Sequence, residues 1–230
     1  MLVIAVLLLA GYVDFLKASE DCENDALIEC LPPEIFPVPF PETEAEINFV
    51  CPKLRDYVHC IQNHLDECGN EDGSFEEQIK VRYEKISEVL SDVCDKGSTL
   101  HDGIIYNIKC LKSRILNHNA SCYDKTEAVL EIYSNHRHLE ETEDINKNSI
   151  YWEEYFCLFE AYDLSCLASD AADRCGLKAK NIILEIVKRL HYLENSCSKK
   201  AREELRNLIE ILNFDVRDKV QLKEMFLNFY

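Results

Sequence analysis

The stretch Tyr151–Cys197, YWEEYFCLFEAYDLSCLASDAADRCGLKAKNIILEIVKRLHYLENSC, decides the fold that the sequence predicts. It carries four cysteines with the spacing C-x8-C-x8-C-x21-C, and it holds the only tryptophan of the chain. The earlier stretch Cys51–Cys94 has nearly the same spacing, C-x8-C-x7-C-x25-C. We therefore expect an all-α protein: a disulfide-stapled helical bundle built from two related helical-hairpin modules.

Composition agrees with a helical, globular chain. The 230 residues are 47% hydrophobic, which is enough to bury a core in one large domain or two small ones. Only 6 glycines and 6 prolines are present. Long β-rich architectures normally need more turn residues than that, so a large sheet is not expected.

Apolar residues recur at every third or fourth position in several segments, which predicts amphipathic helices. Thr43 and Glu46 form an expected N-cap, and Pro52 is a point where the first long helix could break. Helices are expected at Thr43–Cys68, Ser74–Cys94, Ser98–Leu116, Tyr123–Leu139, Ser149–Ala168, Asp170–Cys175, Leu177–Asn195, Lys199–Asn213 and Val216–Phe229.

The expected organisation has four parts. Residues 1–18 are predicted to be a signal peptide, and residues 19–42 a short helix followed by a proline-rich connector. Residues 43–139 would form the first helical module and residues 149–230 the second, either as two domains or as one continuous domain. The polar run Glu140–Asn148 is the expected boundary between the modules.

The first segment predicts secretion. Leu2–Val13 is an uncharged apolar run, and Ala18 is a small residue suited to precede the cleavage site. A buried N-terminal helix is the alternative interpretation. The run is short for a membrane span, and no later stretch is comparably apolar, so we expect an extracellular mature chain without a transmembrane segment.

All the cysteines follow this segment, and their number, 12, is even. In a secreted chain that pattern predicts disulfides, whereas structural zinc sites usually need close C-x2-C or C-x4-C pairs, which are absent. The cysteines expected to be disulfide-bonded are Cys22, Cys30, Cys51, Cys60, Cys68, Cys94, Cys110, Cys122, Cys157, Cys166, Cys175 and Cys197.

Pairing follows from folding each hairpin back on itself. Two cysteines nine residues apart on a helix are separated by about 13 Å, too far for a disulfide, so each must reach a neighbouring segment. Mirror pairing predicts Cys51–Cys94 and Cys157–Cys197. Continuing in order suggests Cys60–Cys110 and Cys68–Cys122, which leaves four cysteines to join the N-terminal piece to the second half: Cys22, Cys30, Cys166 and Cys175.

A net charge of −18 limits the partners that the chain can have. Nucleic acids and anionic lipid surfaces would be repelled. Simple solubility explains the charge, and attraction to a basic partner is the alternative. Asn119 begins an N-x-S sequon, so an N-linked glycan is expected there in a secreted chain.

No residue constellation indicates catalysis. His101 and Asp102 follow Cys94 in a way that invites comparison with secreted phospholipase A2, but the paired cysteine and the glycine-rich calcium loop are missing. His136 and His138 with Glu140 and Glu141 do not match a zinc motif and are interpreted as a solvated helix end. Since nucleophile turns and phosphate loops are also absent, we expect no catalytic, cofactor or metal site.

Two apolar segments have alternative interpretations. Trp152, Tyr155, Phe156 and Phe159 share one helix face, and we expect this face in the core, with a pocket for an apolar ligand as the alternative. The C-terminal VQLKEMFLNFY is amphipathic and is expected to close the core, with docking of a partner as the alternative.

Several elements resemble a known group of proteins: Cys51-Pro52 with Cys60 and Cys68, then VLSDVCDKGSTL and YNIKCL, then Cys166 and Cys175-Gly176-x-x-Ala179. They are similar to secreted cysteine-rich helical proteins of arthropods, such as haemolymph glycoproteins of about this size and secreted or venom-gland proteins of spiders and ticks. A similar layout occurs in a domain expanded in nematodes. The resemblance implies an extracellular helical protein without catalytic residues.

The sequence therefore predicts a secreted, non-enzymatic protein that binds an extracellular protein partner or a small apolar molecule, and neither nucleic acid nor a cofactor. A component of venom or saliva acting on a host target is the alternative. A secreted hydrolase is the third hypothesis, which the missing nucleophile and metal motifs disfavour.

Overall fold

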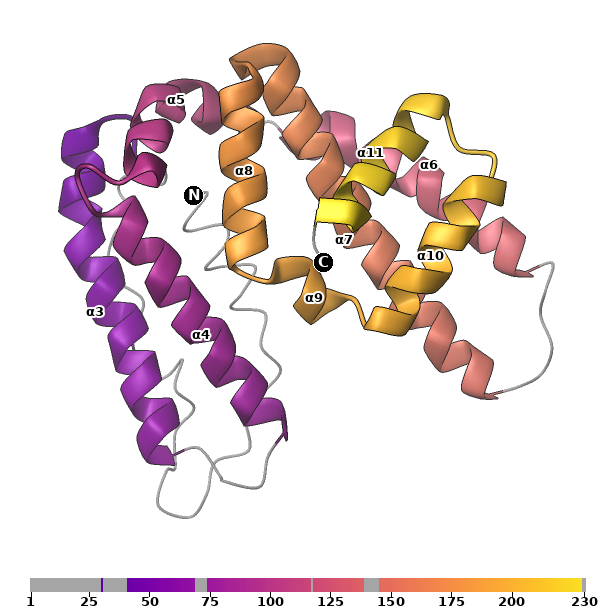
Figure 1. Cartoon of the computed structure of the whole chain (residues 1–230), viewed down its shortest axis with the longest axis horizontal. Coiled ribbons are helices and arrows are strands. Elements are labelled where there is room, and N and C mark those ends of the chain that lie inside the picture. Colours follow the sequence, from indigo (N-terminus) through magenta and orange to yellow (C-terminus); the bar gives the residue numbers. More distant parts are fainter. Residues whose placement is uncertain (1–29, 31–40, 69–73, 117, 139–144, 229–230) are drawn as a thin grey trace. The chain divides into compact units, whose positions relative to one another are not determined.

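The computed structural model describes Cys30 and residues 41–68, 74–116, 118–138 and 145–228. Within these ranges the chain is helical and has no β-strand, which confirms the predicted all-α class (Figure 1). The helices are α3 (Glu44–Cys68), α4 (Ser74–Val93), α5 (Thr99–Leu116), α6 (His118–His138), α7 (Ile145–Cys175), α8 (Leu177–Arg189), α9 (Tyr192–Ser196), α10 (Lys199–Ile211) and α11 (Val216–Asn228). The expected signal peptide, the first short helix and nearly all of the proline-rich connector lie outside the described residues.

The chain divides into two compact units, Met1–Lys112 and Ser113–Tyr230, called here the N-terminal and C-terminal units. The expected boundary at Glu140–Asn148 is therefore wrong by one helix, because α6 packs against α7 within the C-terminal unit. The polar run thus joins two helices that pack against each other.

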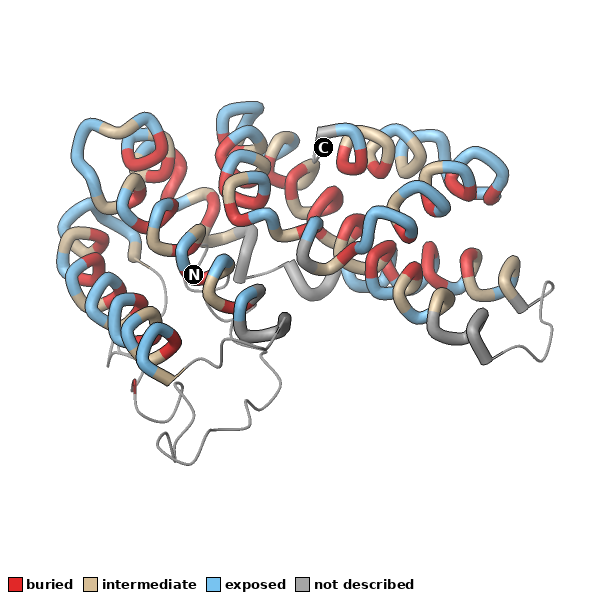
Figure 2. Tube along the Cα trace, turned by 60° about the horizontal axis from the view of Figure 1, so that its bottom comes forward, coloured by how far each residue is buried: buried red, intermediate tan, exposed pale blue. Residues whose placement is uncertain are grey.

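In the N-terminal unit, α3 and α4 pack together as the predicted hairpin. The Thr43 hydroxyl accepts a hydrogen bond from the Glu46 amide at 3.2 Å, which confirms the expected N-cap. The helix continues through Pro52 without ending there. Figure 2 shows buried residues recurring along these helices. They are the predicted apolar stripes, including Ile47, Val50, Leu54, Val58, Ile61 and Leu65 on α3 and Ile79, Tyr83, Ile86, Leu90 and Val93 on α4.

In the C-terminal unit, α7 is the helix on which α6, α8, α10 and α11 all pack. It runs through Cys175, so the expected interruption near residue 169 is absent. Ala168 and Ala171 are fully buried and continue the inner face of the helix past that point. The helix stops before Gly176, whose φ of 88° suits glycine. The C-terminal segment closes this core as expected, with Leu222, Met225 and Phe226 buried.

The helix expected at Leu177–Asn195 is divided into α8 and α9. His191 separates them with a left-handed backbone conformation, φ 50° and ψ 33°. Periodicity alone could not reveal this break, because the apolar residues keep a helical spacing across it.

Four disulfides are fully described: Cys30–Cys60, Cys51–Cys94, Cys122–Cys166 and Cys157–Cys197. The two hairpin pairs, Cys51–Cys94 and Cys157–Cys197, are confirmed. The suggested Cys60–Cys110 and Cys68–Cys122 pairs are wrong, as is the assignment of Cys30 and Cys166 to bonds between the N-terminal piece and the second half. Cys68, Cys110 and Cys175 are also disulfide-bonded, and Cys22 lies outside the described residues.

The observed pairing makes the two units equivalent. Matching Cys51 with Cys157 also matches Cys60 with Cys166, and it matches Cys94 with Cys197 once three fewer residues in the second unit are allowed for. Each matched cysteine then has a matched partner, because Cys60 bonds to the upstream Cys30 while Cys166 bonds to the upstream Cys122. The module therefore includes a segment before its long helix, and α6 supplies that segment in the C-terminal unit.

Candidate functional site

The most unusual feature of the described residues is an exposed group of aromatic side chains at the start of α7. Trp152 is 51% exposed and Phe156 is 56% exposed, while Tyr151 and Tyr155 beside them are half-buried. We call these four residues the aromatic surface. The expectation that Trp152 and Phe156 lie in the core is wrong, although they do share a helix face as predicted.

The reason is the rotation of α7 about its axis. Its inner face is formed by Glu154, Cys157, Leu158, Ala161 and Ser165, all of which are buried. At the start of this helix the aromatic Trp152 and Phe156 therefore lie on the outside, whereas Tyr162, further along the helix, is buried. A helix that is apolar on both faces gives no periodicity from which its inner side can be chosen.

The four rings contact one another in a continuous chain. The centroids of Tyr151 and Trp152 are 5.2 Å apart in an edge-on arrangement, and those of Trp152 and Phe156 are 6.0 Å apart and stacked. Tyr155 lies 5.6 Å from Trp152 and 5.8 Å from Phe156, edge-on to both. Such contacts restrict the rotamers of the rings before any partner arrives.

A buried polar cluster beneath the aromatic surface fixes α7 against α6. The carboxylate of Glu154 is fully buried, and its Oε2 accepts hydrogen bonds from the Tyr133 hydroxyl at 2.7 Å and from the Arg137 Nε at 3.1 Å. The Arg137 Nη2 forms a further ion pair with the same oxygen. Within the described part of the chain the other oxygen, Oε1, is buried without a hydrogen-bond partner.

This cluster also positions Tyr151. Its ring stacks on the ring of Tyr133 with centroids 5.7 Å apart, and its hydroxyl is 3.1 Å from the Ser134 hydroxyl. Burial, followed by the hydrogen bond to Glu154, raises the pKa of Tyr133 well above its ordinary value. The phenol therefore remains a neutral donor at physiological pH, and the cluster keeps its geometry.

Carboxylates border the aromatic surface. The Cys122–Cys166 disulfide and the Tyr133–Glu154 hydrogen bond set α6 antiparallel to α7. Glu127 and Glu131 are exposed on α6 between these two ties, and Glu127 lies beside the Tyr123 hydroxyl, which interacts electrostatically with Tyr155. On α7 itself, Glu160 follows Phe156 by one helical turn.

The equivalent helix of the N-terminal unit lacks this surface. Matching Cys51 with Cys157 puts Glu46, Phe49 and Val50 at the positions of Trp152, Tyr155 and Phe156. The hairpin therefore folds without an aromatic stripe at this place, and the fold does not require one. Large exposed aromatic side chains that folding does not need indicate an interaction site.

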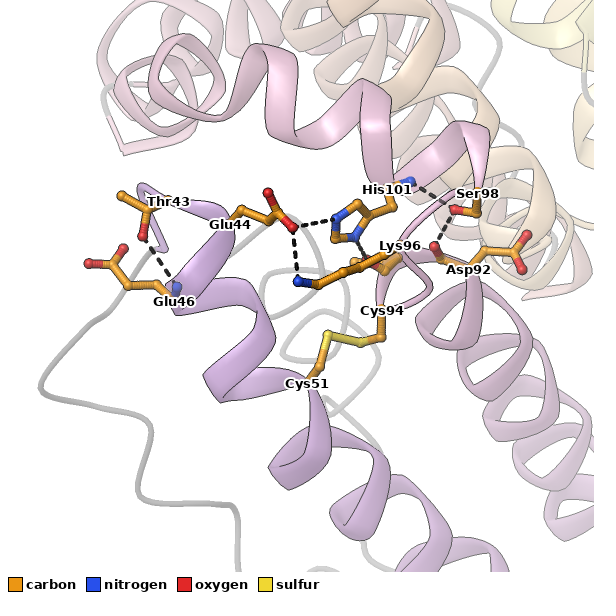
Figure 3. Close-up of polar contacts among 10 residues, drawn as sticks. Thr43, Glu44, Glu46, Cys51, Asp92, Cys94, Lys96, Ser98 and His101 are labelled. Atoms are coloured by element: carbon orange, nitrogen blue, oxygen red, sulfur yellow. Dashed lines mark hydrogen bonds and ion pairs between the residues drawn. A yellow bond between two sulfur atoms is a disulfide. The ribbon is translucent and has the colours of Figure 1, made fainter.

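His101, the residue that invited comparison with phospholipase A2, has a structural position. It is 2% exposed, and its Nδ1 donates to the Val93 carbonyl at 2.7 Å. Its Nε2 lies 4.0 Å from a carboxylate oxygen of Glu44, as Figure 3 shows. No substrate could reach a ring buried in this way, so His101 ties the start of α5 to α3 and to the end of α4.

The surrounding contacts support the same role. The Ser98 hydroxyl accepts from the His101 amide at 2.9 Å and donates to the Asp92 carbonyl, which caps α5. Lys96 forms an ion pair with Glu44 at 3.2 Å, and this contact lowers the pKa of the Glu44 carboxyl (Figure 3). The Cys51–Cys94 disulfide lies nearby.

The other predicted candidates are only partly described. His136 lies half-buried on α6, whereas the His138 side chain, Glu140 and Glu141 fall outside the described residues. Asn119 is in the first turn of α6, but its side chain is not described, so its glycosylation stays a prediction. Among the side chains that the structure describes, no three His, Cys, Asp or Glu residues gather as a metal site would require.

The largest groove formed by residues that the structure describes is open to solvent and has a volume of about 610 Å³. It lies between the end of α7, the start of α8 and the start of α11. Its exposed apolar residues are Leu177, Val216 and Val220, and charged residues such as Asp173 and Arg217 line it as well. A groove so open and mixed in polarity does not enclose an apolar ligand as carrier cavities do.

Sequence reasoning missed Glu154 and Arg137. Glu154 follows another glutamate, and nothing in the pair Glu153-Glu154 shows which one is buried. Only the position of Glu154 on α7, one helical turn before the buried Leu158, indicates that its side chain is buried.

Comparison of the chain with protein families, with curated proteins and with solved structures found no match.

Proposed function

We propose that this is a secreted, non-enzymatic extracellular protein that binds another protein through the aromatic surface on α7. The observation that carries the proposal is the exposure of Trp152 and Phe156 above a buried cluster that holds their helix in place. Tryptophan and tyrosine are the residues most enriched at the energetic centres of protein interfaces. Rings that are already ordered lose less conformational entropy on binding.

Several features support the extracellular part of the proposal. The apolar N-terminal run has the composition of a signal peptide, and the cysteines are paired in disulfides, which form and persist in oxidising compartments. None of the described helices has the length and apolarity needed to cross a bilayer. The resemblance to secreted cysteine-rich helical proteins points the same way.

A protein partner is favoured over a small apolar ligand. The aromatic surface is convex, since it lies on the outer side of a helix, and the largest described groove is open and partly charged. Both features suit contact with another macromolecule better than enclosure of a small molecule. The proposal that the protein is not an enzyme rests on the sequence, which lacks nucleophile, phosphate-loop and metal motifs.

The test begins with the protein purified from its native source. We expect mass spectrometry to find a mature chain starting near Ser19 and a native complex with a defined second protein. The complex is then reconstituted from the purified components with wild-type protein and with the double variant Trp152→Ser/Phe156→Ser. Loss of the complex in that variant, with an unchanged far-ultraviolet circular dichroism spectrum, would support the proposal.

Two results would contradict it. One is a full-length chain that retains residues 1–18 inside cells. The other is a complex that the double variant forms as tightly as the wild type. An exposed position on another helix, Ile211→Ser on α10, serves as the control that should leave the complex unchanged.

A further inference from the structure

The carboxylates around the aromatic surface indicate what kind of partner it fits. We propose that it binds a cationic apolar segment of another protein, with arginine or lysine side chains lying over the rings and aliphatic side chains packing between them. This inference rests on the proposed function and gives the chemistry of the partner. It does not involve the core or the disulfides.

The exposed rings suit a cation. Trp152 and Phe156 are the residues of the aromatic surface most open to solvent, and the face of an aromatic ring carries partial negative charge. A guanidinium or ammonium group over such a face is stabilised by a cation–π interaction. The protein already shows this contact elsewhere, because the Lys53 ammonium lies 4.4 Å from the centroid of the Phe49 ring.

Negative charge lies close to the rings. Glu127 is exposed on α6 beside the Tyr123 hydroxyl, which is near enough to Tyr155 to interact with it electrostatically, and Glu131 is exposed one helical turn further along α6. Glu153 and Glu160 flank the rings on α7, both half-buried. The nearby Arg137 does not offset these charges, because its guanidinium is paired with the buried Glu154.

A second copy of the chain is a poor occupant for this surface. A chain of net charge −18 repels its own copy, and the carboxylates beside the rings would face each other across a two-fold interface. The same charges attract a cationic partner: they accelerate its association and disfavour the binding of acidic proteins.

The single tryptophan makes the electrostatic premise directly measurable. Trp152 is the only tryptophan, so the fluorescence of the whole protein reports on this surface. We expect caesium to quench it more strongly than iodide at low salt, because a negative local potential concentrates cations. Stronger quenching by iodide would overturn the inference without any variant being made.

Binding is then tested with three helical peptides of equal length, in which leucine alternates at helical spacing with arginine, glutamine or glutamate. Each is titrated into the full-length protein while Trp152 fluorescence is recorded. We expect binding of the arginine peptide alone, and weakening in about 0.5 M NaCl, where the Debye length falls to about 4 Å.

Two variants locate the interaction. Phe156→Ala, which keeps the reporter, is expected to weaken binding of the arginine peptide about tenfold. The triple variant of Glu127, Glu131 and Glu153 to Gln is expected to weaken it by a similar factor and to reduce the preference over the glutamine peptide. Matched controls are Phe49→Ala and the triple variant of Glu185, Glu203 and Glu204 to Gln, which changes the net charge equally but away from this surface.

The outcomes separate this inference from the proposed function. Equal binding of the arginine and glutamine peptides, still dependent on Phe156, would overturn the cationic partner and leave a protein-binding surface. Absence of peptide binding, concentration-dependent dimerisation lost in Phe156→Ala, or a blue shift of Trp152 with phosphatidylcholine vesicles would each overturn the inference. The last two would assign the surface to a second copy or to a lipid.

Discussion

At the scale of single residues, Glu154 is the position on which the candidate site depends. It is fully buried, it pairs with Arg137 and Tyr133, and one of its oxygens has no hydrogen-bond partner among the described residues. Removing one member of a buried ion pair leaves the other member uncompensated. The adjacent Glu153 has the same chemistry on the outside of the helix, so the two residues form a matched pair for experiment.

Glu154→Gln is expected to lower the free energy of unfolding by about 2–3 kcal/mol, because Arg137 loses its carboxylate partner. Glu153→Gln should change it by less than about 0.5 kcal/mol. Urea unfolding followed by circular dichroism compares the two variants with the wild type. Equal effects of the two substitutions would contradict the burial of Glu154.

Tyr162 gives a prediction for alkaline pH. Its hydroxyl donates to Asp218 at 2.8 Å, and burial, followed by this hydrogen bond, raises its pKa above the ordinary value near 10. A raised pKa in the folded state means that the stabilisation is complete below about pH 10 and is lost as pH rises beyond it. Urea unfolding should therefore show that the excess free energy of unfolding of the wild type over Tyr162→Phe decreases between about pH 9 and pH 11. An excess that stays constant or increases over this range would contradict a raised pKa of Tyr162 in the folded state.

At the scale of elements, the long helices were predictable and the orientation of α7 was not. The stripes of α3 and α4 are apolar on one side only, so periodicity identified both the helices and their buried faces. Along α7, aromatic residues on one side and Leu158, Ala161 and Ala168 on the other leave two possible inner faces. The choice is made by packing: Ala161, Ala168 and Ala171 let the neighbouring helices approach closely, and Tyr162 is the large ring that this core accommodates.

The break between α8 and α9 is a second case in which local sequence was insufficient. His191 has a left-handed conformation that costs a residue with a Cβ about 1–2 kcal/mol. Since the left-handed region is least accessible to β-branched residues, His191→Gly should be more stable than His191→Val by about 1 kcal/mol or more. Thermal unfolding of the two variants tests this. Both variants lose the contact between the His191 and Glu194 side chains, so this loss does not affect the difference in stability between them. A valine variant as stable as the glycine variant would argue for a continuous helix.

At the scale of the whole molecule, the repeated cysteine spacing predicted the two hairpins and their disulfides. Folding each hairpin back on itself does not predict the remaining pairs, because each module begins before its long helix. If the repeat holds for every cysteine, Cys60 and Cys166 must have equivalent partners. In the structure each of them bonds to a cysteine in the segment upstream of its long helix. The same rule would have placed α6 in the second module.

The two units also differ in charge. Residues 1–112 contain 22 acidic and nine basic side chains, whereas residues 113–230 contain 21 acidic and 16 basic ones. Most of the net negative charge therefore belongs to the N-terminal unit, although the aromatic surface with its local carboxylates belongs to the C-terminal unit. Net charge alone could not have located the site.

Removing one disulfide should reveal whether the units are stabilised separately. Cys157 and Cys197 are 40 residues apart, so the double variant Cys157→Ala/Cys197→Ala should lose about 4 kcal/mol by the loop-entropy relation. Hydrogen exchange of the full-length protein is expected to accelerate in residues 145–197 and to stay unchanged in residues 44–112. Acceleration in both ranges together would show that the two units unfold as one.

The order of the cysteines along the chain has a consequence for biosynthesis. Because the two modules repeat one spacing, a chain with all its thiols free could also pair Cys51 with Cys197 in place of Cys94, although the longer loop closes less readily. The pairs Cys30–Cys60 and Cys51–Cys94 are complete by residue 94, before the first cysteine of either Cys122–Cys166 or Cys157–Cys197 has been synthesised. If the chain is oxidised as it is synthesised, the thiols of these pairs would become available one module at a time, and the order of translation would disfavour pairing between the modules.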